Sequence, residues 1–193
     1  FIFEKLISFK YEVAVQVARS RAGHVVFFPF VKTIQKDKKC FLVEGPEKTD
    51  ALTRKLQKTI QIFLNKIDYV GVIGFEFFKI QNDLILNEVA PRVHNTGHHT
   101  LDSCNIDQFT MHWLCILQDK LPQVVLKSRS FVMLNLIGKS DSEVGVPDRT
   151  SGSLYWYGKK NRKGRKLGHI NFIGENKKAL VSQALKELKL WQL

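Results

Sequence analysis

The amino-acid sequence predicts an α+β fold, in which an antiparallel sheet with helices is followed by a small β-rich C-terminal domain. Three observations favour this class. Residues 11–19 (YEVAVQVAR) alternate polar and apolar side chains, which is typical of a half-buried strand. Residues 49–67 repeat apolar side chains at helical spacing. Strand-like runs return after the helical pattern ends near Leu121, so we expect two domains, 1–120 and 121–193.

Further elements of the first domain follow from the same periodicities. A second strand is expected in HVVFFPF. The first helix has Thr49 or Asp50 as its cap and apolar residues at positions 52, 56, 60, 63, 64 and 67. Two more strands are expected at 69–78 and 83–89, joined by a short turn centred on Asn82. A second helix is expected at 105–117.

The second domain is predicted to be mostly strands. A strand region is expected in QVVLKSRSFVMLNLIG, and two more strands are expected in LYWYGK and LGHINFIG, on either side of a basic turn. A helix over residues 177–190 then closes the domain.

Composition limits the classes of partner. The 193 residues include 30 basic and 18 acidic ones, which gives a formal net charge of +12. This excess favours an anionic partner, either nucleic acid, acidic lipid or a phosphate-bearing metabolite, although a solvated lysine-rich surface has the same composition. No window has the roughly 18 unbroken apolar residues of a membrane span.

The start of the chain and its cysteines bear on location. The chain begins with a strand-like run and without Met or a signal peptide, so we expect that an upstream part of the protein is missing. Three cysteines without C-x-x-C spacing suggest reduced thiols, and hence a cytoplasmic protein.

Two glutamates on the predicted hairpin suggest a metal site. Glu76 and Glu88 each lie six residues from Asn82, so they face each other in an antiparallel pair. Opposed carboxylates need a cation between them, and Mg²⁺ prefers oxygen ligands together with substrate phosphates. A register error of one residue would instead put the glutamates on opposite faces, and a lysine such as Lys79 is an alternative partner for one of them.

The stretch LNEVAPRVHNTGHHT, residues 86–100, concentrates polar groups directly after Glu88. Arg92 is suited to binding a phosphate or carboxylate in a bidentate manner, and His94, Asn95 and Thr96 supply a base and donors for a small oxyanion. A zinc site is disfavoured because no third Cys or His stands at motif spacing.

The turn GKKNRKGRK, residues 158–166, has six basic residues in nine. Nucleic-acid binding is one interpretation, but no nucleic-acid-binding motif accompanies this short cluster. A compact basic hairpin is equally suited to a single phosphate monoester, and a solvated loop is the third alternative.

Together these motifs resemble those of the 5-(carboxyamino)imidazole ribonucleotide synthases of purine biosynthesis, a family of ATP-grasp enzymes. The resemblance runs from Phe1 to at least Ile173 and is carried by YVGVIGFEFF, LNEVAPRVHNTGHHT, QFTMH, VMLNLIG and LYWYGKKNRKGRKLGHINFI. It implies the C-terminal part of an ATP-grasp domain followed by the small β-rich domain.

The resemblance also implies roles for individual residues, with ATP and Mg²⁺ as cofactors. It makes Glu76 and Glu88 the metal ligands. The implied nucleotide-binding residues are Glu4, Lys5, Leu6 and Ile7 at adenine, Glu12 at the ribose, and also Gln35, Asn87 and Glu88. Bicarbonate and the transferred phosphate are surrounded by Arg92, His94, Asn95 and Thr96, and the substrate 5′-phosphate is held by Lys159, Arg165 and Lys166. The chain departs from the family at Gln35, where a histidine is usual, and at Lys32, where an acidic residue is usual.

The implied reaction is ATP- and bicarbonate-dependent carboxylation of aminoimidazole ribonucleotide through carboxyphosphate, by a carbon–nitrogen ligase. Small-molecule substrates are expected, with no nucleic acid and no membrane, and either a homodimer or a fusion to a carboxylase (mutase) domain. Two alternatives remain open at this point: a catalytically silent ATP-grasp fragment, and a basic nucleic-acid-binding module.

Overall fold

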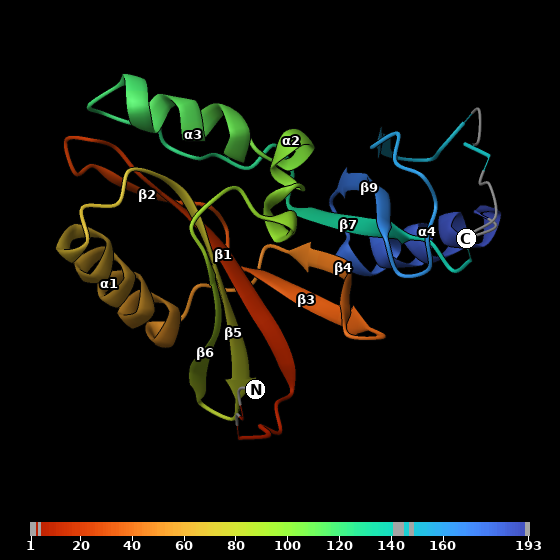
Figure 1. Cartoon of the computed structure of the whole chain (residues 1–193), viewed down its shortest axis with the longest axis horizontal. Helices are drawn as coiled ribbons and strands as arrows, with labels where there is room; N and C mark the ends of the chain where they lie inside the picture. Colours follow the sequence, from red (N-terminus) through yellow and green to blue (C-terminus); the bar gives the residue numbers. More distant parts are fainter. Residues whose placement is uncertain (1–2, 4, 141–144, 147–148, 192–193) are drawn as a thin grey trace.

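An antiparallel sheet with helices on both faces forms the core of the molecule, and the predicted α+β class is confirmed (Figure 1). The computed structural model describes residues 3, 5–140, 145–146 and 149–191. In the described part the strand order is β6-β5-β1-β3-β4-β7-β9-β8, with β2 paired to β1, and every pair is antiparallel. The strands are β1 (Tyr11–Arg19), β2 (Val25–Phe27), β3 (Val31–Lys36), β4 (Lys39–Gly45), β5 (Gly71–Ile80), β6 (Asp83–Ala90), β7 (Ser130–Ile137), β8 (Ser153–Trp156) and β9 (Lys166–Gly174).

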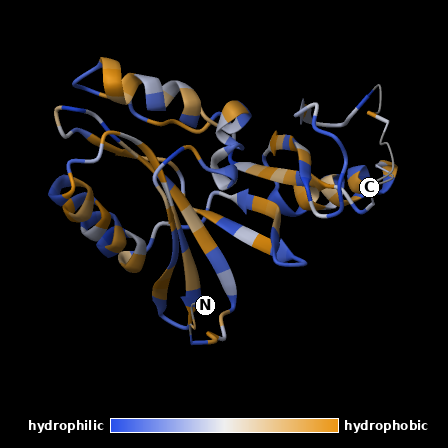
Figure 2. Cartoon of the chain, viewed as in Figure 1, coloured by the Kyte–Doolittle hydropathy of each residue, from blue (hydrophilic) through white to orange (hydrophobic). Residues whose placement is uncertain are grey.

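The helices cover different parts of this sheet. They are α1 (Ala51–Lys66), the 3₁₀ turn η1 (Asn95–Gly97), α2 (Thr100–Ser103), α3 (Gln108–Leu117) and α4 (Lys177–Leu190). Ile60 and Leu64 of α1 pack on the valines of β1, and Figure 2 shows both blue and orange residues on this helix, as expected of an amphipathic one. Met111 and Cys115 of α3 pack on the opposite face, against β1 and β5. None of the helices in the described ranges is long and apolar enough to cross a membrane.

The second half of the chain extends the same sheet. β7 pairs with β4 from Leu42↔Leu134 to Gly45↔Phe131, so the sheet is continuous from the first half into the second. α4 packs on β7 and β9 through Leu180 and Ala184. The division into domains 1–120 and 121–193 stays a prediction.

The hairpin of β3 and β4 was not predicted from the sequence. Its turn residues, Asp37 and Lys38, both have positive φ, 51° and 59°, which suits a tight two-residue hairpin turn. Four lysines interrupt this segment, so its hydrophobic alternation is weak. The strand expected over residues 123–138 begins only at Ser130.

Candidate active site

Polar side chains gather on the sheet face opposite α1. Successive side chains of a strand point to opposite faces. In β1 the buried valines pack toward α1, so Glu12 and Gln16 point to the other face, where α3 packs on Ala18. Glu76 of β5 lies opposite Ala14 of β1 and therefore joins this face. The polar face thus lies between α3 and the far end of β1.

Glu76 and Glu88 are paired, as the sequence predicted, but through a different register. The turn spans residues 81–82, so its predicted centre at Asn82 was wrong. The four pairs nearest the turn form a regular hairpin that, if continued, would place Asn87 opposite Glu76. A β-bulge then adds one residue to β6, so Glu88 takes this place. The bulge therefore restores the opposition of the two carboxylates.

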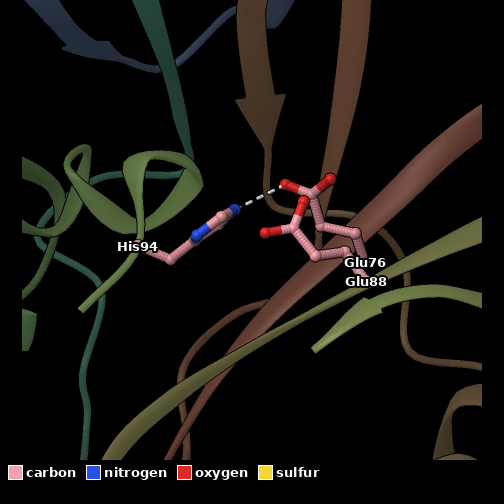
Figure 3. A group of neighbouring side chains, drawn as sticks. All are labelled: Glu76, Glu88 and His94. Carbon is pink, nitrogen blue, oxygen red and sulfur yellow. Dashed lines mark hydrogen bonds and ion pairs between the residues drawn. The ribbon is translucent and has the colours of Figure 1, made fainter. Parts of the chain in front are cut away.

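His94 completes a group of three possible ligands with this pair (Figure 3). One ligand atom from each of Glu76, Glu88 and His94 lies within 4.8 Å of the others. Nε2 of His94 is 2.8 Å from Oε1 of Glu76, and both residues are buried, whereas Glu88 is exposed. Opposed carboxylates repel each other, and a divalent cation that prefers oxygen ligands would remove this repulsion. The residues present therefore fit a magnesium ion held by the two glutamates, with His94 orienting one of them.

The segment that carries His94 is held by Gln108, which sequence reasoning did not single out. The Gln108 side chain is fully buried. Its Oε1 accepts from the His94 backbone N–H at 2.9 Å, and its Nε2 donates to the His94 carbonyl at 2.9 Å and contacts Nδ1 of His98 at 2.7 Å. A Cβ at Gly97 would lie 2.5 Å from Oε1 of Gln108, so only glycine fits here. Gln108 is the first residue of the QFTMH motif, from which no role for this side chain was predicted.

Gln16 holds the same segment from the sheet. Its Nε2 donates to the hydroxyl of Thr96 at 2.8 Å, and Thr96 is fully buried. In this arrangement Thr96 anchors the segment to β1.

Glu12 and Gln35 lie together, as their expected nucleotide roles require. Gln35 and Thr33 both donate to Oε2 of Glu12. Burial raises the pKa of the Glu12 carboxyl, the hydrogen bond from Gln35 opposes this shift, and the charges of Glu76 and Glu88 add to it. The Glu12 carboxylate therefore interacts electrostatically with both Glu76 and Glu88.

The segment expected at adenine precedes β1. Lys5 and Leu6 are exposed, Ile7 is partly buried, and Glu4 lies outside the described residues. No hydrogen bond to Glu12 or Gln35 is found for these three described residues.

The three basic residues predicted to bind one phosphate make different contacts in the structure. Lys166 Nζ donates to Oδ1 of Asn95 at 2.7 Å, on the side of the glutamates. Burial lowers the pKa of the Lys166 ammonium, while the charges of Glu76 and Glu88 raise it. The other two are exposed: Lys159 Nζ lies 4.9 Å from the ring centroid of Tyr157, and Arg165 contacts the carbonyl of Lys160 at 3.5 Å.

Several basic groups of the chain act electrostatically on His98. Burial and, to a smaller extent, the charges of Lys166, His94, Arg92 and Lys159 together lower the pKa of His98 to about 4. Arg92 itself is exposed, and its Nη1 donates to the carbonyl of Val93 at 2.9 Å. Several positive charges next to a carboxylate pair suit a ligand that brings both a metal ion and anionic groups.

Comparison with known proteins places this geometry in a family. A family model described as the ATP-grasp domain matches residues 1–109. The chain belongs to the ATP-grasp family. A second model, described as the phosphoribosylaminoimidazole carboxylase C-terminal domain, matches residues 132–183. The ATP-grasp match thus covers every residue of the Glu76–Glu88–His94 group.

Individual relatives confirm the resemblance predicted from the motifs. The chain is 38% identical to an N5-carboxyaminoimidazole ribonucleotide synthase from Synechococcus elongatus, over 88% of this chain and 45% of the relative. Among solved ATP-grasp structures, the synthetase from Thermus thermophilus has a TM-score of 0.84 and 33% identity, over 96% of this chain and 51% of that one. An Aspergillus clavatus synthase in complex with ADP and 5-aminoimidazole ribonucleotide has a TM-score of 0.79 and 28% identity, over 96% and 52%. The chain therefore spans about half the length of these relatives.

Buried imidazoles beside the ATP-grasp site make stability depend on pH. His99 stacks on Phe131 with ring centroids 4.1 Å apart, and burial lowers its pKa from 6.5 to about 3. It stays neutral in the folded protein while the unfolded chain takes up a proton, so it makes stability fall as the pH drops through 6.5 toward 3.

We expect His99→Phe to make this acid-side fall shallower, by about 1.4 kcal/mol per pH unit, because one proton fewer is taken up on unfolding. Urea unfolding at several pH values between 4 and 7 checks it. His99→Phe removes the hydrogen bond between Nδ1 of His99 and Oγ of Ser103 at 2.8 Å. Tyr69→Phe likewise removes one hydrogen bond, from the Tyr69 hydroxyl to the Val72 carbonyl, but no group that titrates in this range, so its slope should match that of the wild type. An unchanged slope in His99→Phe would contradict the assignment.

Proposed function

We propose that the protein is an ATP-grasp carbon–nitrogen ligase that carboxylates 5-aminoimidazole ribonucleotide with ATP and bicarbonate, through carboxyphosphate. The observation that carries this proposal is the opposition of Glu76 and Glu88, beside His94 and within electrostatic reach of Lys166. The Aspergillus clavatus relative, solved with ADP and 5-aminoimidazole ribonucleotide, supports the choice of substrates.

Glu76 and Glu88 are the residues that would hold Mg²⁺. When bound, this ion neutralises negative charge on the β- and γ-phosphates of ATP. Glu12, with Gln35 and Thr33 donating to it, is oriented to accept hydrogen bonds from the ribose hydroxyls. Gln35 thus acts here through its amide, in place of the family's usual histidine.

Arg92 and Lys166 are the proposed anion-binding side chains of the reaction. Bicarbonate attacks the γ-phosphorus, and the bond to the β-phosphate oxygen breaks, which gives carboxyphosphate and ADP. Arg92 is exposed and suited to binding the transferred group in a bidentate manner. Lys166 and Asn95 are joined by a 2.7 Å hydrogen bond, so they approach the reacting groups as a unit.

His94 is the proposed group for proton transfer. Its Nε2 is fixed by Glu76, and its Nδ1 has no hydrogen-bond partner among the described residues. A histidine held in this way by a carboxylate has a defined orientation and tautomer. This suits it to take the proton that the substrate amine releases when the carbon–nitrogen bond forms and the carbon–oxygen bond of carboxyphosphate breaks, with inorganic phosphate as the leaving group.

Phosphate release from ATP tests the proposal. The protein in its full natural length should release phosphate with bicarbonate, and the release should become stoichiometric with product when aminoimidazole ribonucleotide is added. No release from a folded protein would favour the catalytically silent alternative. Tight binding of polynucleotide, falling steeply with salt, would instead favour the nucleic-acid-binding alternative.

A further inference from the structure

A pocket lies beside the basic turn, and neither Glu76 nor Glu88 is among its lining residues. It has a volume of about 300 Å³ and is bounded by the tip of the β3–β4 hairpin, the end of β7, the basic turn and α4. The hairpin belongs to the segment matched by the ATP-grasp model, and β7 and the turn to the segment matched by the C-terminal model. Both matched segments therefore contribute to one pocket.

Four lysines line this pocket. Lys36 and Lys39 come from the hairpin, whose tip is blue in Figure 2, while Lys139 and Lys163 come from the second half of the chain. Asp37 is the one carboxylate in the lining among the described residues. Four ammonium groups against one carboxylate make the pocket strongly cationic, which favours an anion with more than one negative charge.

The hairpin lysines keep hydrogen-bonding capacity. Lys39 Nζ makes only a long contact, 3.5 Å, with the carbonyl of Asp37, and Lys36 Nζ lies 5.5 Å from the ring centroid of Phe41. Neither forms an ion pair with a carboxylate in the described ranges. Their ammonium groups are therefore available to a ligand.

The floor of the pocket is apolar. Phe41, Ile137 and Leu188 line it and are all partly buried. Phe41 and Leu188 pack against the hydrophobic core beneath β7 and β9. A ligand that fills this pocket would bury an apolar body against these three side chains and direct its anionic group to the lysines.

Gly164 brings the basic turn and the hairpin together. Its φ is +77°, and a Cβ there would lie 2.9 Å from both Cε and Nζ of Lys39. Asn135, also in the lining, donates to Oδ1 of Asn95 at 2.9 Å and to the carbonyl of Cys40 at 3.0 Å. The pocket is thus joined to the candidate active site by one amide pair, although the proposed substrate-phosphate residues Lys159, Arg165 and Lys166 do not line it.

We propose that this pocket is a second ligand site, which binds a small aromatic organophosphate, with the phosphate among Lys36, Lys39 and Lys139 and the ring on Phe41, Ile137 and Leu188. This proposal goes beyond the proposed function, because none of the residues that line the pocket takes part in the reaction steps described above.

Isothermal titration calorimetry with 1-naphthyl phosphate tests the site in the full-length protein. Inorganic phosphate and 1-naphthol, each carrying half of the probe's chemistry, should bind at least tenfold more weakly. Lys36→Glu and Lys139→Glu, made separately, should each weaken the probe about tenfold or more, because a charge-assisted contact becomes a repulsion. Lys58→Glu, on the exposed side of α1, makes the same change in net charge and should leave the affinity within twofold.

Three results would overturn the site: no binding of the probe to the wild type, equal weakening by Lys58→Glu, or displacement of the probe by aminoimidazole ribonucleotide, which would assign it to the substrate site. Glu88→Gln separates this inference from the proposed function. That variant should bind the probe like the wild type, even if the wild type releases no phosphate from ATP.

Discussion

Glu88→Gln is expected to lower the rate of ATP cleavage by at least about 100-fold in the full-length protein, with its fold unchanged. The substitution keeps the shape of the side chain but removes the charge that faces Glu76 across the hairpin. A neutral amide is a poor ligand for Mg²⁺ and no longer balances the ion's charge. Steady-state phosphate release at saturating Mg²⁺ measures the effect.

A shift in the Mg²⁺ requirement should accompany the loss of rate, so magnesium titrations belong with the assay. Glu175→Gln is the matched control, because Glu175 is exposed and paired with Arg129 at 3.2 Å, away from the glutamate pair. The control should retain wild-type turnover. Wild-type turnover in Glu88→Gln would remove the metal assignment.

Gln108→Leu is expected to lower the free energy of unfolding by about 3 kcal/mol, because it leaves buried polar groups without partners. The backbone N–H and carbonyl of His94 both depend on the Gln108 amide. Leucine has a similar volume, so the loss comes from hydrogen bonds rather than from a cavity. Chemical unfolding at neutral pH measures it.

ATP cleavage should fall with stability in Gln108→Leu, because His94 loses the contacts that hold it against Glu76. Gln61→Leu, at an exposed position of α1, makes the same chemical change and should alter stability by less than about 0.5 kcal/mol. If Gln108→Leu unfolded like this control, the buried amide would not be what positions the segment.

Strong local periodicity made α1, α4 and β1 predictable. The sequence predicted the helix over residues 177–190, and α4 has these bounds. β1 was likewise predicted at 11–19, and Asp50, one of two cap candidates, caps α1 by accepting from Thr53 at 2.8 Å. Each of these signals lies within one element, so no knowledge of its neighbours was needed.

Contacts between distant segments could not be predicted in the same way. In the sequence, Gln108 is simply a polar residue near the start of a predicted helix. Its hydrogen bonds to the backbone of His94 exist only because the fold brings the two segments together. The bulge at Asn87 was likewise not predictable from local periodicity. The predicted pairing of Glu76 with Glu88 was correct only because this bulge offsets the error in the predicted centre of the turn. At the basic turn, neighbouring residues diverge: Lys166 enters β9 and turns to Asn95, while Arg165 stays in solvent.

The β4–β7 pairing has a mechanical consequence. Backbone hydrogen bonds of this pair join the two segments matched by the family models, so the glutamate hairpin and the basic turn are connected through one continuous sheet. A hinge motion between the two segments would break the backbone hydrogen bonds between β4 and β7 and the side-chain hydrogen bonds between Asn95 and Asn135. The proposed nucleotide site on the glutamate hairpin and the proposed phosphate-binding residues of the basic turn therefore keep a fixed spacing across the β4–β7 pair.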